Sequence, residues 1–241
     1  MRAIYETRGR AREYCELAIN LYTGCGHQCI YCYGADVTHQ DRDQWKNNPQ
    51  PRSGIIGQLC RDAVACAKRG EERPILLCFV TDPYQPIDDV HRLAREAILI
   101  LKSYNLRVTI LTKAGIRAQR DWDLLGKRDA FATTLTLFSN EDSLVWEPHA
   151  ASPAERIENL IRAHELDLET WVSCEPVIYP KATLELIKLT APFVDHYKVG
   201  TMNYHPHGKT IDWHRFAHDV KQTLESLEKP YYLKKDLAKY L

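Results

Sequence analysis

Residues 23–34 read TGCGHQCIYCYG and place three cysteines, Cys25, Cys29 and Cys32, close together. Sites built only from cysteine favour zinc or an iron–sulfur cluster. Structural zinc takes four ligands, and no fourth Cys or His stands at a zinc-finger distance from this trio. A cubane cluster held by three thiolates leaves one iron open to a non-protein ligand, and an open position indicates chemistry rather than scaffolding. A zinc site or a redox-active dithiol is the alternative.

The composition is that of an ordinary globular protein. The chain has 241 residues, of which 44% are hydrophobic and 27% are charged, and this length suits one α/β barrel domain. Lys+Arg and Asp+Glu both number 32, so the formal charge is zero, which argues against a protein that binds by covering phosphates. No apolar run reaches the ~18 residues of a membrane span, and no signal peptide is recognisable. We therefore expect a cytoplasmic protein with reduced cysteines.

Strand-like and helix-like segments alternate along the chain. The expected strands are 17–22, 75–80, 106–111, 130–137, 169–174 and 194–200. The expected helices are 54–70, 89–104, 116–127, 152–166, 181–192 and 211–227. Six such units predict a single α/β domain with a parallel sheet, as a partial barrel or as an open doubly wound sheet. Both arrangements place functional residues at the carboxyl ends of the strands, where the cysteine loop also lies.

The remaining segments are expected to be less regular. Residues 35–54 read as a long polar loop, and residues 231–237 as a short edge element. We expect an N-terminal arm over 1–16, the barrel over 17–228 and a C-terminal tail over 229–241.

The CxxxCxxC spacing after a first strand, the aromatic Tyr31 beside the last cysteine and the β/α order resemble the radical S-adenosylmethionine (radical SAM) superfamily. The resemblance implies a partial (β/α)6 barrel and a 4Fe-4S cluster on Cys25, Cys29 and Cys32. It implies that the open iron chelates the amino and carboxylate groups of S-adenosylmethionine (SAM). It also implies that one electron, from a reductant of the flavodoxin or ferredoxin type, cleaves SAM. The 5′-deoxyadenosyl radical then abstracts a hydrogen from the substrate.

Further stretches are similar to the spore-photoproduct-lyase-like branch over roughly residues 8–205. They are TDPYQP (81–86), LTKAG (111–115), EPVI (175–178) and KVG (198–200). The likeness implies that cofactor contacts come from Tyr31, Thr81, Asp82, Lys113, Glu175 and Lys198. An ion pair between Glu175 and Lys198 is the structural alternative for those two.

The branch also implies candidate catalytic residues. Tyr31 and Tyr33 match a tyrosine pair implicated in relaying the radical. The branch places a hydrogen-donating cysteine where Phe79 stands here. Cys78 is one residue away, which on a regular strand turns it to the other face, and we keep it as a candidate to meet the radical.

Together these features predict a radical SAM enzyme of the lyase or oxidoreductase type. The branch suggests a nucleobase or nucleotide as the substrate, and a peptide or small metabolite is the alternative. A second class is a non-catalytic iron–sulfur electron carrier or a redox sensor that binds nucleic acid, which would have no use for Lys113 or Thr81. The histidines of YHPHG (204–208), His205 and His207, are expected in a substrate-contacting loop rather than at a metal.

Overall fold

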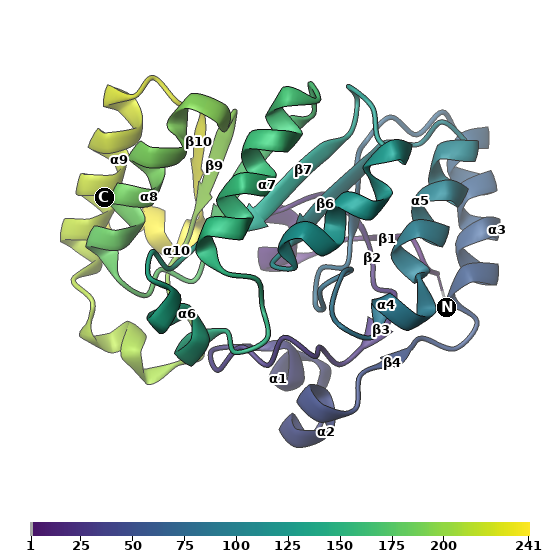
Figure 1. Ribbon diagram of the computed structural model, residues 1–241, viewed down its shortest axis with the longest axis horizontal. Helices are drawn as coiled ribbons and strands as arrows, with labels where there is room; N and C mark the ends of the chain where they lie inside the picture. Colours follow the sequence, from purple (N-terminus) through teal and green to yellow (C-terminus); the bar gives the residue numbers. More distant parts are fainter. Residues whose placement is uncertain (1) are drawn as a thin grey trace.

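Eight strands form one sheet in the computed structural model, which describes residues 2–241 (Figure 1). In sheet order they are β1 (Tyr5–Glu6), β2 (Leu17–Ile19), β5 (Ile75–Leu77), β6 (Val108–Thr112), β7 (Ala130–Thr134), β8 (Glu169–Cys174), β9 (His196–Val199) and β10 (Tyr231–Leu233). All neighbours are parallel except β1 and β2. Within the described residues β1 and β10 do not pair, so the sheet is an open, partial barrel. The predicted fold class is confirmed.

Helices follow the parallel strands and lie outside the sheet (Figure 1). The longer ones are α3 (Ile55–Lys68), α5 (Leu93–Ser103), the 3-10 helix η2 (Gly115–Leu124), α7 (Pro153–Glu165), α8 (Pro180–Thr190) and α9 (Trp213–Ser226). The start of α7 follows from its sequence, since Pro153 occupies the first turn and the Ser152 hydroxyl accepts the Glu155 N–H at 3.2 Å.

The shorter elements include several that the sequence did not predict. They are η1 (Gly9–Glu13), α1 (Gly34–Thr38), α2 (Arg42–Asn47), α4 (Asp88–His91), α6 (Asn140–Trp146), η3 (Ala191–Phe193), η4 (Pro206–Thr210) and α10 (Lys235–Ala238). The expected loop over 35–54 is therefore wrong, because it contains α2 and the strand β4 (Gln50–Pro51), which pairs with β3 (Tyr22–Thr23). The polar start of α2 is stabilised by Asp41, whose carboxylate accepts two backbone N–H bonds.

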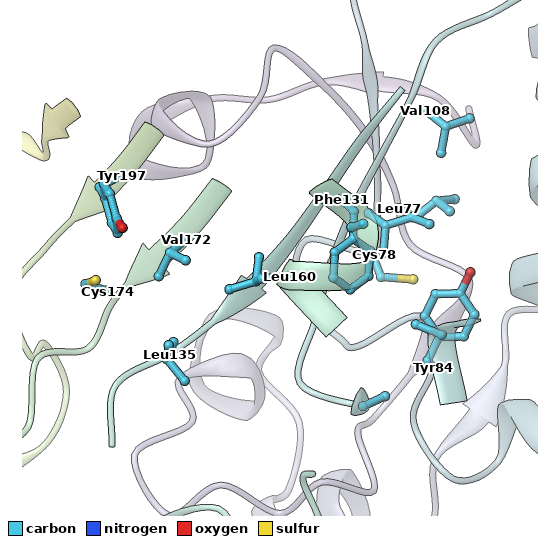
Figure 2. Close-up of a cluster of buried hydrophobic side chains, with 14 of the residues drawn as sticks. Leu77, Cys78, Tyr84, Val108, Phe131, Leu135, Leu160, Val172, Cys174 and Tyr197 are labelled. Carbon is cyan, nitrogen blue, oxygen red and sulfur yellow. The ribbon is translucent and has the colours of Figure 1, made fainter. Parts of the chain in front are cut away.

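The main core fills the layer between the sheet and the helices. Figure 2 shows one side chain after another from neighbouring strands in this layer: Leu77, Val108, Phe131, Val172 and Tyr197. All five are buried, and Leu160 of α7 packs against them. Alternation along each strand directs the intervening residues to the inside of the barrel.

The inside of the barrel is filled by an aromatic side chain from the N-terminal arm. Small residues on the strands, including Ala18 and Ala132, leave room for Tyr14, which packs beside Trp171 with ring centroids 6.4 Å apart. The arm and the tail also extend the sheet, since β1 lies in the arm and β10 in the tail. The arm and the tail therefore both contribute to the layer beneath the carboxyl ends of the strands, which we call the floor of the cavity.

Candidate functional site

A cavity of about 400 Å³ lies at the carboxyl ends of the parallel strands. It collects nearly all of the site residues predicted from the sequence: Cys25, Cys29, Tyr31, Cys32, Tyr33, Cys78, Thr81, Asp82, Lys113 and Glu175. Lys198 is not among its lining residues. A larger, more open hollow nearby, of about 650 Å³, contains none of the three clustered thiols.

The cysteine loop is fastened on one side by the buried side chain of Gln85. Its amide oxygen accepts the Gly26 N–H at 2.8 Å, and its amide nitrogen donates to the Gly24 carbonyl at 3.1 Å. The Cys25 N–H donates to the carbonyl of Trp45 in α2 at 2.9 Å. Gly24 has φ +79°, and a Cβ there would lie 2.6 Å from that same carbonyl oxygen, so only glycine fits this close approach.

On its other side the cysteine loop contacts the end of α6. The Ile30 N–H donates to the Trp146 carbonyl at 3.0 Å, and the Tyr31 hydroxyl donates to the carboxylate of Glu147. Glu147 in turn pairs with Arg156 of α7 at 2.5 Å, and both side chains are almost fully buried. The sequence analysis missed Glu147 and Arg156, because no motif spacing marks a charged pair that meets only after folding.

Lys113 follows β6 and brings a positive charge to the cavity. Its ammonium lies 5.8 Å from the centre of the Tyr31 ring and forms no ion pair with any residue in 2–241. Burial opposes its charged form, but the neighbouring Cys29 and Glu147 raise the pKa of Lys113 above its ordinary value. A cation held in this way is suited to an anionic ligand.

The Asp82 carboxylate is already hydrogen-bonded by other groups of the protein. Its carboxylate accepts the Thr112 hydroxyl at 2.7 Å and the backbone N–H groups of Lys113 and Tyr84 at 2.7 and 2.9 Å. It also faces Nδ1 of His27 at 3.5 Å. Asp82 thus ties the ends of β5 and β6 to the cysteine loop.

Two buried polar atoms of cavity-lining residues have no hydrogen-bond partner within residues 2–241. They are the Thr81 hydroxyl and Nε2 of His27. Burial lowers the pKa of His27 to about 4, so its ring is neutral near pH 7. Buried polar groups are normally satisfied, which indicates that a ligand completes this wall.

The three thiols fit an iron–sulfur cluster by chemistry and by place. They line one cavity, and burial raises the pKa of Cys29 to about 12 and that of Cys25 well above its usual range. Such thiols become thiolates when a metal group supplies positive charge. No three His, Cys, Asp or Glu side chains in the described range converge on a single ion. In a cubane each thiolate binds a different iron, so its ligands need not meet at one point.

The outer rim of the cavity is aromatic and basic. The rings of Tyr33 and Tyr204 stack with centroids 5.8 Å apart and planes inclined by 27°. The guanidinium of Arg10 lies 5.9 Å from the centre of the Tyr204 ring, and Arg8 lines the same opening. Tyr204 is 58% exposed, so this aromatic rim is open to solvent.

Cys78 and Phe79 both line the cavity, which differs from the expectation that they face opposite ways. The alternation of a strand ends before them, because β5 stops at Leu77 and Cys78 has φ +58°. The Cys78 sulfur accepts the Leu21 N–H at 3.5 Å, and burial raises its pKa to about 12. It is therefore a neutral thiol at the cavity wall.

Glu175 and Lys198 do not pair with each other. The Glu175 carboxylate pairs with Lys234, and the Lys198 ammonium donates to the carbonyls of Glu13 and Tyr14 at 3.1 and 2.5 Å. The structure thus brings Glu175 to the cavity but uses Lys198 to hold the N-terminal arm.

His205 and His207 pack against an aromatic side chain rather than against each other's ring. Their ring centroids lie 5.2 and 5.3 Å from that of Trp146. Nε2 of His207 is 3.0 Å from the Ile178 carbonyl. The pair packs the segment that follows the exposed Tyr204 against Trp146 of α6.

Comparisons with known proteins agree on the type of fold. A family model described as the radical SAM superfamily matches residues 19–194. A spore photoproduct lyase variant with bound AdoMet and dinucleoside spore photoproduct has a TM-score of 0.69 at 15% identity, covering 92% of this chain and 76% of its own. A second lyase variant has a TM-score of 0.72 at 14% identity, with 96% and 78% covered.

A further similar structure is that of SuiB from Streptococcus suis bound to S-adenosylmethionine. Its TM-score is 0.66 at 13% identity, and the match covers 90% of this chain but only 49% of SuiB, about half its length. No curated protein matches the sequence. None of the helices in residues 2–241 is long and apolar enough to cross a membrane.

Proposed function

The chain belongs to the radical SAM superfamily, whose cofactors are a 4Fe-4S cluster and S-adenosylmethionine, and we propose that it cleaves SAM reductively and abstracts a hydrogen from a nucleotide-like substrate. The observation that carries this proposal is that one cavity joins three clustered thiols to a lysine that has no ion-pair partner in residues 2–241. When bound, the cluster and SAM supply one-electron cleavage of a sulfonium C–S bond. The electron comes from an external reductant of the flavodoxin or ferredoxin type.

The chain's own residues fit the two cofactors in separate parts of the cavity. Cys25, Cys29 and Cys32 would hold the cluster. Lys113 offers its ammonium to the carboxylate of SAM, and the unpartnered Thr81 hydroxyl offers a polar contact to the methionine amino group. Asp82 orients this wall through its bonds to Thr112 and Lys113. The buried wall also shields the reacting groups from bulk solvent.

Lys113 gives the sharpest test of SAM cleavage. After anaerobic reconstitution, the wild type with SAM and dithionite is expected to hold about four irons per chain and to form 5′-deoxyadenosine. Lys113→Met should keep the iron and reduce product formation at low SAM by about tenfold or more, because a charge-assisted hydrogen bond is lost. Lys127→Met is the control, because Lys127 is exposed and does not line the cavity.

The outcomes separate the candidate classes. Iron without 5′-deoxyadenosine in the wild type would favour the electron carrier or redox sensor. Zinc in place of iron would favour a structural module. An unchanged Lys113→Met variant would contradict the placement of the SAM carboxylate.

The rim supports a nucleotide as the substrate. Stacked Tyr33 and Tyr204 offer π-faces to a base, and Arg8 and Arg10 offer charge to a phosphate. One similar lyase structure contains a dinucleoside, which also favours a nucleotide. A SuiB structure contains a precursor peptide instead, which favours the peptide alternative.

Deuterium transfer tests the substrate class. Perdeuterated thymidine dinucleotide is expected to yield 5′-deoxyadenosine that carries deuterium, because the abstracted atom ends on that product. A perdeuterated basic peptide of similar size is the matched comparison. Transfer from the peptide alone would overturn the nucleotide proposal and favour a peptide substrate.

A further inference from the structure

The floor of the cavity holds a carboxylate that both ends of the chain reach. Tyr14 of the arm donates its hydroxyl to Oε2 of Glu175, and Lys234 of the tail donates its ammonium to the same oxygen. The Lys234 ammonium also sits 3.0 Å from the centre of the Tyr14 ring. Lys234 is 1% exposed, so its charge depends on this pairing.

The other carboxylate oxygen of Glu175 is left free. Oε1 accepts no hydrogen bond from any residue in 2–241, although Glu175 lines the cavity and its side chain is only 15% exposed. A Cβ at Gly200 would lie 2.7 Å from Oε1, so glycine at this position lets the carboxylate adopt its observed place. A carboxylate can accept about four hydrogen bonds, and here the protein fills one oxygen only.

Two donors on one oxygen also fix the direction of the other. The Tyr14 ring is itself held by Phe79, at a centroid distance of 5.5 Å, and by Trp171. Glu13, the residue before Tyr14, accepts the Tyr232 hydroxyl at 3.0 Å and the Lys235 N–H at 2.8 Å. The arm and the tail are therefore joined beneath the cavity, and both hold Glu175.

Buried ion pairs stabilise a fold less, on average, than apolar packing at the same place, so stability alone does not account for the pair between Glu175 and Lys234. We propose that Tyr14 and Lys234 are positioning residues, which orient Glu175 so that its free oxygen accepts a hydrogen bond from SAM in the cavity. The inference rests on the proposed function, because it takes SAM as the occupant. It assigns to the two chain ends a role in cofactor binding that no motif in them indicates.

Equilibrium binding of SAM to the reconstituted, oxidised protein tests the proposal without turnover. Glu175→Gln is expected to weaken the Kd for SAM by about tenfold, because a charge-assisted acceptor becomes neutral. Tyr14→Phe should weaken it by about fivefold, and the double variant should be no weaker than Glu175→Gln alone, since Tyr14 acts through that carboxylate. Tyr232→Phe is the matched control: it removes a tyrosine hydroxyl from the same junction but not from Glu175.

Thermal unfolding midpoints are measured for every variant. Lys234→Met leaves a buried carboxylate short of a partner and should lower the midpoint as well as the affinity, so Tyr14→Phe carries the test. A lower midpoint with an unchanged Kd in Tyr14→Phe would show a purely structural role and overturn the inference. The same holds if Tyr232→Phe weakens binding equally. If the wild type binds and cleaves SAM, either of these outcomes overturns the inference but leaves the proposed function standing. A wild type that binds no SAM overturns the inference and the proposed function together.

Discussion

Replacing Cys29 with alanine is expected to abolish both the cluster and SAM cleavage. Cys29 is buried at the cavity wall between Cys25 and Cys32, and a cubane normally needs every protein thiolate that it has. We expect iron to fall from about four per chain to near zero, and 5′-deoxyadenosine to fall by about 1,000-fold or more. Iron analysis, the visible absorption of the cluster and product chromatography measure the change.

Cys60→Ala is the control for Cys29→Ala. Cys60 is a half-buried thiol on α3 and does not line the cavity, so its loss should leave the iron content and the product unchanged. Full iron in Cys29→Ala would mean that the trio does not hold the cluster. Equal loss in Cys60→Ala would point to general misfolding or to a different set of ligands.

The sequence was sufficient to predict the barrel because its strands and helices repeat a simple pattern. The strands around Leu77, Phe131 and Val172 are short runs of small, apolar and β-branched residues that are buried almost throughout, as expected for a sheet covered on both faces. The cysteine trio was also visible, since its spacing is local. The helix expected over 116–127 is instead the 3-10 helix η2, because helical periodicity does not distinguish the two hydrogen-bond patterns.

The supports of the site could not be predicted in the same way. Gln85, Glu147 and Lys234 each lie far in sequence from the group that they hold, and a single sequence carries no sign of such contacts. Lys198 was expected to contact the cofactor because it ends a strand, but it does not line the cavity. Its ammonium instead satisfies two backbone carbonyls of the arm.

Arg156→Met is expected to destabilise the fold more than any surface substitution. Arg156 donates to the carbonyls of Ala151 and Thr134 at 2.9 and 3.0 Å, and it neutralises the buried Glu147. Removing one partner of a buried pair costs about 3–5 kcal/mol, which corresponds to a fall of roughly 10 °C in the midpoint for a chain of this size. Lys188→Met, in the exposed pair with Glu185, should change stability by less than about 1 kcal/mol.

The pH dependence of this loss identifies its cause. Burial opposes the charge of Glu147, but Arg156 and Lys113 hold the pKa of its carboxyl below the ordinary value of 4.5. A depressed pKa contributes stability above that value and loses it as the pH falls through the folded pKa. In Arg156→Met the unpaired carboxylate favours protonation, so urea unfolding should show a gap from wild type that is wide at pH 7 and narrows toward pH 4. The gap should also shrink in Arg156→Met/Glu147→Gln, which buries no lone charge. A gap independent of pH would assign the loss to packing of the arginine stem instead.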